Sequence, residues 1–446
     1  MKQDLFIYEN EISGAIICIL FSLFFLNLLS RYWIKEKEKF RLFKYGFYLR
    51  IIGLICYDYF NLIIVKADSL KFYSSAVSVS RLISELRFGE YIKIFYTDFE
   101  NLSFKIKCYF SNYENYNLVY DSNKTLVHLA GIISYFTFDS YLAISFFFSL
   151  CGYLGLWLIY STFINKGYKK NKLFYCFIIL YPTLCFWTTG LMKEPICIGA
   201  IGFIFYILFN KIENNFKRVA FFLLAIISAF FLYKIKSYLL NGLILAFVLS
   251  LSIYSISKLR AVPKLILSVS LITMVLIALF YSKHFIQNKI IEILSEEITD
   301  KVSGITTAQL NHGGSSYDLG QFELSGWSFF KYLIASINVA LFRPYLWEYL
   351  KPQVFLSSLD GLLMNIMFLY ILFKKKFSGI LKMFKRSVIL LFSFFYTIIL
   401  AIMIGGIAFN FGTLSRYKVP LTPFFFAVFI ILYSDSVSNR KSLKNE

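Results

Sequence analysis

Long runs of apolar residues constrain this chain more than any other feature of its sequence. A helix needs about 20 consecutive, mostly apolar residues to cross the hydrocarbon core of a bilayer. Runs near this length recur throughout the 446 residues, and only 16% of the residues are charged, against roughly 25% in an ordinary soluble domain. We therefore predict an all-α, polytopic integral membrane protein with about eleven transmembrane helices.

The predicted spans alternate with short linkers. One further apolar stretch, 329–342, is shorter than a typical span, and we interpret it as a re-entrant or interfacial helix. The predicted spans lie at about 11–30, 45–65, 139–162, 173–189, 196–210, 219–233, 238–257, 265–282, 355–373, 387–409 and 420–434.

Basic residues lie on every second linker, which sets the topology. The positive-inside rule places such linkers in the cytoplasm, so the chain is predicted to start outside and end inside. The first twelve residues contain three acids and one lysine, which fits an external start, and no cleavable signal peptide is predicted. If 329–342 crossed the membrane, the basic linker 374–386 would be external. The basic linkers are 31–44, 166–172, 211–218, 258–264 and 374–386, with a basic tail at 440–444.

This topology predicts a single transmembrane domain, 1–446, with two long extracytoplasmic loops at 66–138 and 283–354. The re-entrant stretch 329–342 belongs to the second loop. Loops of this length without regular structure are uncommon unless they are functional.

The remaining sequence features exclude several functional classes. The net charge of +20 is explained by membrane orientation, so no nucleic-acid partner is predicted. Six of the seven cysteines lie in apolar runs, and the three histidines lack zinc-site spacing, so neither a disulfide framework nor a zinc site is predicted. No phosphate-binding glycine motif is present, which argues against ATP-driven transport by this chain.

Charged residues gather at the predicted outer edge of the membrane. Ionisable groups within or beside spans are energetically expensive and point to functional sites. Their placement on one side of the membrane is a stronger signal than any single residue. They are Asp68, Lys193, Glu194, Arg343, Glu348, Asp360, Arg416 and Lys418.

Two of these pairs have structural alternatives. Lys193 and Glu194, followed by Pro195, are typical of a helix start. Arg343 and Glu348 are spaced as an ion pair that would hold a broken helix.

The other charges also have simpler interpretations. Asp68 can be a solvated residue at a span exit, and Arg416 and Lys418 can be snorkelling anchors. We interpret Lys234 and Lys236, which flank a predicted tight turn, as anchors.

Cations and carboxylates at an outer membrane face suit a lipid-linked diphosphate sugar. Arginine and lysine would stabilise the charge that develops on a diphosphate leaving group, and a carboxylate would serve as general base for the acceptor hydroxyl. We assign catalysis to Asp68 and Glu348, and phosphate binding to Arg343, Arg416, Lys418 and Lys193. We assign supporting roles to Glu194, Asp360, Trp347 and Tyr417. The aromatic rings of Trp347 and Tyr417 are suited to stacking on sugar faces.

Four segments together carry a resemblance to a known class of enzymes. They are Asp68 at the start of the first long loop, the turn 186–194, the segment 341–348, and the segment 412–423. These segments resemble the multi-spanning enzymes of bacterial surface-polysaccharide clusters. That group contains O-antigen and capsule polymerases and GT-C-like glycosyltransferases that use polyprenyl-phosphate sugars.

The resemblance implies a GT-C-like membrane enzyme of the bacterial inner membrane. It would use an undecaprenyl-linked sugar donor, a glycan acceptor and membrane lipid as its partners. Asp68 would match the first-loop acid of GT-C enzymes, and Arg343 and Arg416 the paired outward arginines of polymerases and ligases. The chain departs from the GT-C pattern by an additional span before the acidic loop and by a single acid instead of an adjacent pair. No cofactor is predicted, and a divalent cation stays an open alternative.

Two other functional classes remain open. A transporter or flippase of lipid-linked glycans is the main alternative, although such proteins usually show two comparable helical halves. A scaffold of a polysaccharide assembly complex is the other, and it would not need outward arginines beside carboxylates.

Overall fold

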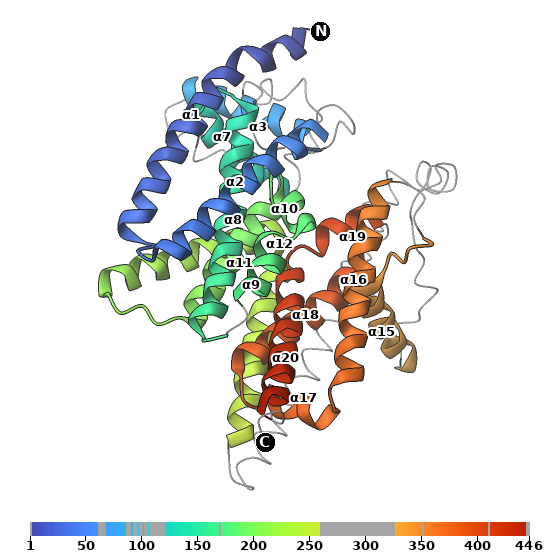
Figure 1. Ribbon diagram of the computed structural model, residues 1–446. Coiled ribbons are helices and arrows are strands. Elements are labelled where there is room, and N and C mark those ends of the chain that lie inside the picture. Colours follow the sequence, from blue (N-terminus) through green and yellow to red (C-terminus); the bar gives the residue numbers. More distant parts are fainter. Residues whose placement is uncertain are drawn as a thin grey trace. The chain divides into compact units, whose positions relative to one another are not determined.

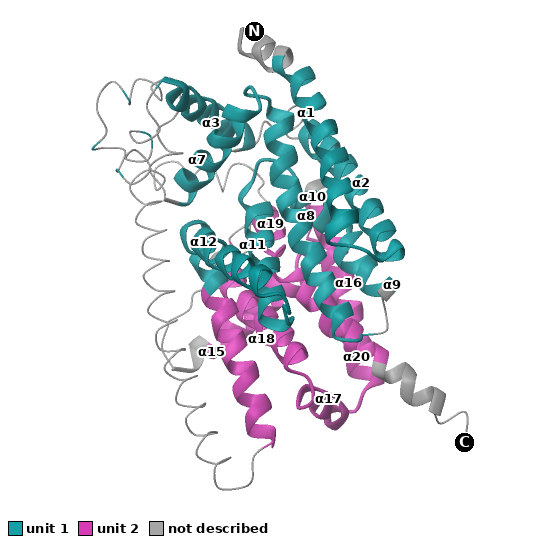
Figure 2. Ribbon diagram, turned by 90° about the vertical axis from the view of Figure 1, so that its left-hand side faces the viewer, with its two compact units in different colours: residues 1–240 teal, residues 241–446 magenta. Residues whose placement is uncertain are grey.

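The computed structural model describes residues 2–60, 68–85, 121–168, 171–258, 326–348, 352–408 and 411–442, together with residues 91, 97, 101 and 106 singly. All regular structure in these ranges is helical, as predicted. The chain divides into two compact units, 1–240 and 241–446 (Figure 2).

Unit 1 is organised around one buried helix, α8, which packs against α1, α2, α7 and α11 (Figure 1). Glycines allow α8 and α11 to approach closely, since a Cβ at Gly155 would lie 2.2 Å from the carbonyl oxygen of Ile198. Small residues promote such helix contacts in membranes. The helices of this half are α1 (Lys2–Tyr32), α2 (Lys37–Tyr59), α3 (Asp68–Glu85), α7 (Asp121–Phe136), α8 (Tyr141–Asn165), α9 (Asn171–Phe174), the π-helix η3 (Tyr175–Ile179), α10 (Pro182–Trp187), α11 (Lys193–Phe209) and α12 (Asn215–Lys258), which continues into unit 2.

The predicted spans 219–233 and 238–257 form one 44-residue element, α12, with a break at Lys236. Lys236 has φ −150° and ψ 78°, outside the helical region. The predicted turn between the two spans is therefore a kink at a single residue.

Unit 2 is organised around α18, which packs against α15 and α20. The contact with α15 is close, because a Cβ at Gly405 would lie 2.0 Å from the carbonyl oxygen of Ser336. Ser387 caps the start of α18 through the backbone N–H of Leu390. The remaining helices of the chain are α15 (Gly326–Phe342), α16 (Pro352–Lys374), α17 (Phe377–Phe384), α18 (Val388–Ile407), α19 (Phe411–Tyr417) and α20 (Thr422–Ser442).

Five described helices are long and apolar enough to cross a membrane, and a bent pair would make a sixth. The protein is therefore a helical, multi-pass membrane protein, with fewer full-length candidate spans in the described residues than the eleven predicted. The five are Asn10–Tyr32, Tyr141–Asn165, Asn215–Lys258, Val354–Lys374 and Val388–Gly406, and the bent pair is Phe411–Tyr417 with Thr422–Ser434, at 65°.

Part of the shortfall has local physical causes, and part falls on residues outside the described ranges. The predicted span 173–189 is divided among α9, η3 and α10, where Pro182 starts a new helix. The predicted span 196–210 lies in α11, which has only 17 residues and so extends about 26 Å. The predicted span 265–282 and the end of 45–65 lie outside the described residues, as do most of the two long loops.

The stretch 329–342 lies in α15, a helix of 17 residues. At about 26 Å it is shorter than a typical hydrocarbon core of about 30 Å. Its interpretation as re-entrant or interfacial stays a prediction.

Candidate functional site

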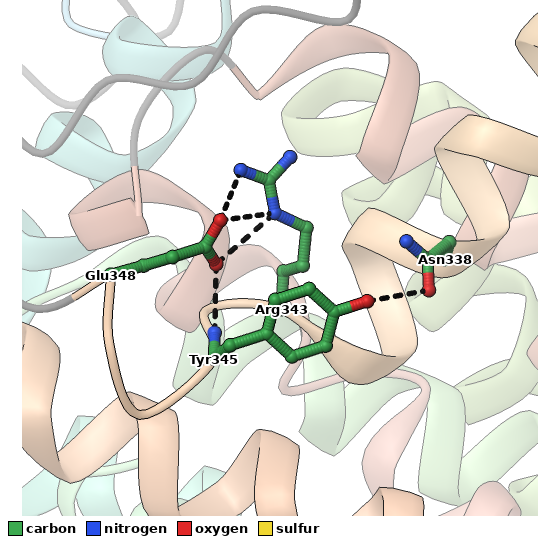
Figure 3. A network of polar contacts seen from close by, with 4 residues as sticks. All are labelled: Asn338, Arg343, Tyr345 and Glu348. Atoms are coloured by element: carbon green, nitrogen blue, oxygen red, sulfur yellow. Dashed lines mark hydrogen bonds and ion pairs between the residues drawn. The ribbon is translucent and has the colours of Figure 1, made fainter.

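The turn that follows α15 contains a closed ion pair between Arg343 and Glu348 (Figure 3). The Nε of Arg343 donates to both carboxylate oxygens of Glu348 at 2.9 and 3.1 Å, and its Nη2 also donates to Oε1. The backbone N–H of Tyr345 donates to Oε2 at 2.8 Å. Glu348 therefore both neutralises the arginine and closes the turn.

Lys418 ties a second segment to this turn. It lies between α19 and α20, is only 4% exposed, and donates from Nζ to the carbonyl oxygen of Arg343. Asp360 of α16 acts on the Lys418 ammonium as a nearby opposite charge. The Arg343 guanidinium also lies over the ring of Phe411 in α19, 5.4 Å from the ring centre. We call Arg343, Glu348, Asp360 and Lys418 the Arg343 cluster.

Small residues hold the surrounding helices close to this cluster. A Cβ at Gly361 would lie 2.7 Å from the carbonyl oxygen of Phe342 and 2.9 Å from that of Pro344. The hydroxyl of Ser415 in α19 donates to that of Ser357 in α16 at 2.6 Å. These contacts fix the positions from which the charged side chains extend.

The ion pair remains partly accessible, and an aromatic pair lies beside it. The side chains of Arg343 and Glu348 are 20% and 18% exposed. Tyr345 and Trp347 stack with ring centres 4.9 Å apart, and Trp347 is 80% exposed. The Tyr345 hydroxyl is held by the side-chain oxygen of Asn338 at 3.2 Å (Figure 3).

This arrangement has a definite chemical capacity. The Arg343 fork already binds an oxyanion, the Glu348 carboxylate, in a two-point geometry that a phosphate group also fits. A phosphate in that place would release Glu348 to accept a proton, and exposed aromatic rings would offer a face for a sugar. The same ion pair is also what the structural alternative for these two residues predicts.

Two other predicted site residues of unit 2, Arg416 and Tyr417, come directly before Lys418 in the chain. Arg416 and Tyr417 form the end of α19 and are both half-buried. Lys418 is occupied by a backbone carbonyl in this structure, so the phosphate-binding role of this residue stays a prediction, as does that of Arg416.

The predicted site residues of unit 1 occupy helix starts. Asp68 is the first residue of α3, and Lys193 and Glu194 begin α11. Lys193 donates to the hydroxyl of Ser122 at 2.9 Å, and Glu194 forms an ion pair with Lys236 at 3.0 Å. The convergence of these residues with the Arg343 cluster stays a prediction.

The interpretation of Lys236 as a membrane anchor is wrong. Its side chain is 9% exposed, that of Glu194 is 1% exposed, and the two form a buried ion pair at the kink of α12. Lys236 therefore lies buried against Glu194 at the residue where α12 breaks.

Sequence reasoning also missed two buried charges on α2. Arg50 is 2% exposed and Asp58 is 6% exposed, and both lie on the face of α2 that is buried. The signal was present, because both residues fall inside the predicted span 45–65, where a charge is expensive.

Within the described residues, no three histidine, cysteine, aspartate or glutamate side chains gather as a metal site of that composition requires. No protein-family model, curated protein or solved structure matches this chain.

Proposed function

We propose that the protein is a membrane glycosyltransferase or repeat-unit polymerase of cell-surface polysaccharide biosynthesis. It transfers a sugar or oligosaccharide from an undecaprenyl-(di)phosphate donor at the outer face of the bacterial inner membrane. The finer topology belongs to the same proposal, with about eleven spans, a GT-C-like arrangement, an external N-terminus and a cytoplasmic C-terminus.

The observation that carries the proposal is the partly accessible pair of Arg343 and Glu348 beside a stacked aromatic pair. A diphosphate leaving group gains negative charge in the transition state, and a fixed guanidinium stabilises that charge more than the ground state. Glu348 is hydrogen-bonded to the same guanidinium. A donor phosphate that displaces Glu348 from Arg343 would therefore bind to the arginine and leave the Glu348 carboxylate available as the general base.

The roles follow from these positions. Arg343 binds the donor phosphate, and Glu348 takes the proton of the acceptor hydroxyl. Lys418 and Asp360 position the backbone of Arg343, and Trp347 contacts sugar. Asp68 is the second candidate base, from the first long loop.

The experiment is surface-polysaccharide production in cells that carry single variants. Arg343→Lys keeps the charge but loses the fork, and we expect about 10²–10³-fold less product. Glu348→Gln is expected to lose about 10²–10⁴-fold. The matched control is Arg386→Lys, the same change at an exposed arginine of unit 2, which should leave product unchanged.

Expression level and thermal stability separate a chemical role from a structural one. Both variants should accumulate normally in the membrane while lipid-linked donor builds up. Product at the wild-type rate from stable Arg343→Lys protein would overturn the proposal.

A further inference from the structure

The short helix α17 of unit 2 connects two helices that are long and apolar enough to cross a membrane. It joins the end of α16 to the start of α18, and the whole connection is 375–387 (Figure 1). A chain that leaves one spanning helix and enters the next within so few residues stays at the bilayer surface. α17 therefore lies at that surface.

The apolar residues of α17 share one face of the helix. Positions 377, 380, 381 and 384 have the i, i+3, i+4, i+7 spacing that gathers side chains on one side, and all four are apolar. No residue of α17 is buried, and Phe377 and Leu381 are 74% and 42% exposed. Phe384 contacts the ring of Phe394 in α18, with ring centres 4.9 Å apart. This contact holds α17 against unit 2 and leaves most of its apolar face uncovered.

Lysines surround this uncovered face. The segment 374–386 contains six basic residues and no acidic one. Four of its lysines are exposed and form no ion pair with any residue that the structure describes: Lys374, Lys376, Lys382 and Lys385. With Phe377 and Leu381, they form what we call the α17 surface. Its positive charge is not balanced by the protein around it.

We propose that the α17 surface binds anionic phospholipids. A helix with one apolar and one basic side lies in the plane of the membrane interface, with its apolar side chains among the acyl chains. The lysine stems then carry their ammonium groups to the level of the lipid phosphates. A zwitterionic lipid would cover the apolar face equally well, but only a lipid with net negative charge also neutralises the lysines.

The residue types also predict how selective the site is. Lysine supplies a point charge without the planar fork of arginine, so the surface distinguishes headgroups by net charge more than by shape. An acidic protein segment would match the charge, but it would have to displace lipid from a face that α16 and α18 hold at the bilayer. Lipid is therefore the occupant that the position of α17 favours.

The test is lipid binding to the purified, delipidated full-length protein, measured by native mass spectrometry. Phosphatidylglycerol and phosphatidylcholine with the same acyl chains are titrated at equal ionic strength. Phosphatidylglycerol should bind at least tenfold more tightly, its affinity should fall as salt is added, and inorganic phosphate should not displace it. Equal affinity for the two lipids, or displacement by inorganic phosphate, would overturn the proposal.

Variants assign the lipid preference to the α17 surface. Lys382→Gln and Lys385→Gln should each weaken phosphatidylglycerol binding by about fivefold and leave phosphatidylcholine binding unchanged, whereas Lys382→Arg should bind both as the wild type does. Leu381→Ser should weaken binding of both lipids equally. The matched control is Lys39→Gln, because the charge of Lys39 is already balanced by Glu36 at 2.8 Å.

All of these changes are at accessible side chains, so the variants should keep the wild-type Tm. A phosphatidylglycerol preference that survives the double variant Lys382→Gln/Lys385→Gln would overturn the assignment. A loss in Lys39→Gln as large as that in Lys382→Gln would do the same, since it would show a response to total charge alone.

Discussion

The buried ion pair between Glu194 and Lys236 makes the sharpest prediction about stability. The two charges are 3.0 Å apart, with side chains 1% and 9% exposed. At an effective dielectric of about 20, their attraction is about 5–6 kcal/mol, which roughly offsets the cost of desolvating both ions. Removing one partner forfeits the attraction and keeps the other's desolvation cost. We therefore expect Glu194→Gln to lower the free energy of unfolding by about 3–5 kcal/mol.

A double-mutant cycle tests this reasoning. Lys236→Met should also destabilise, but the double variant should be more stable than Glu194→Gln alone, because no buried charge is left without its partner. The assay is SDS-induced unfolding in mild detergent, followed by tryptophan fluorescence.

The matched control is the surface pair of Glu36 and Lys39. Their atoms lie 2.8 Å apart, yet the side chains of Lys39 and Glu36 are 39% and 68% exposed. Glu36→Gln should cost no more than about 1 kcal/mol. Equal costs for Glu194→Gln and Glu36→Gln, or a double variant that equals the sum of its singles, would refute the argument.

Three further predictions follow from individual contacts and from the charge pattern. Gly361→Ala should destabilise the protein by about 1–3 kcal/mol, because the new Cβ would meet two backbone oxygens. Gly379→Ala, which has open space around it, should not destabilise the protein. Comparison of the Tm values of the two variants checks this. Burial, reinforced by the Lys124 charge, lowers the pKa of His128 to about 3. The unfolded chain therefore takes up a proton near pH 6.5 that the folded chain does not, so stability is complete above that pH and falls by about 2 kcal/mol between pH 7.5 and pH 5. Unfolding titrations should lose this slope in His128→Asn, and an unchanged slope would contradict it. A reporter fused after Lys376 should be cytoplasmic and one inserted near Gly314 extracytoplasmic; two reporters on the same side would mean that α15 crosses the membrane.

The sequence predicted the helical class and several helix positions well, because apolar run length is a strong local signal. It predicted spans less well where tertiary contacts decide the helix ends. Pro182 and the π-helix before it divide one apolar run into three pieces, and Lys236 interrupts another without a loop. Hydropathy does not distinguish a kinked helix from two helices.

The candidate site was predictable in part. Arg343, Glu348 and Lys418 were selected from their charge and predicted side, and in the structure Arg343 pairs with Glu348 while Lys418 donates to the backbone carbonyl of Arg343. The hydrogen bond from Lys418 to a backbone carbonyl depends on how α19 packs. No pattern of residues in the sequence shows that packing. Arg50 and Asp58 were missed although each stands in an apolar run, since the significance of such a charge depends on which face of the helix is buried.

The most direct test of the proposed function is transfer by the purified protein in nanodiscs. The substrate is a pool of undecaprenyl-diphosphate-linked oligosaccharides from the source cells, and mass spectrometry measures released undecaprenyl diphosphate and lengthened glycan. The account predicts release and lengthening by the wild-type protein, about 10²–10³-fold slower for Arg343→Lys. Lipid-linked oligosaccharide that crosses the bilayer of sealed vesicles containing the protein, without release of undecaprenyl diphosphate, would contradict the account and identify a transporter.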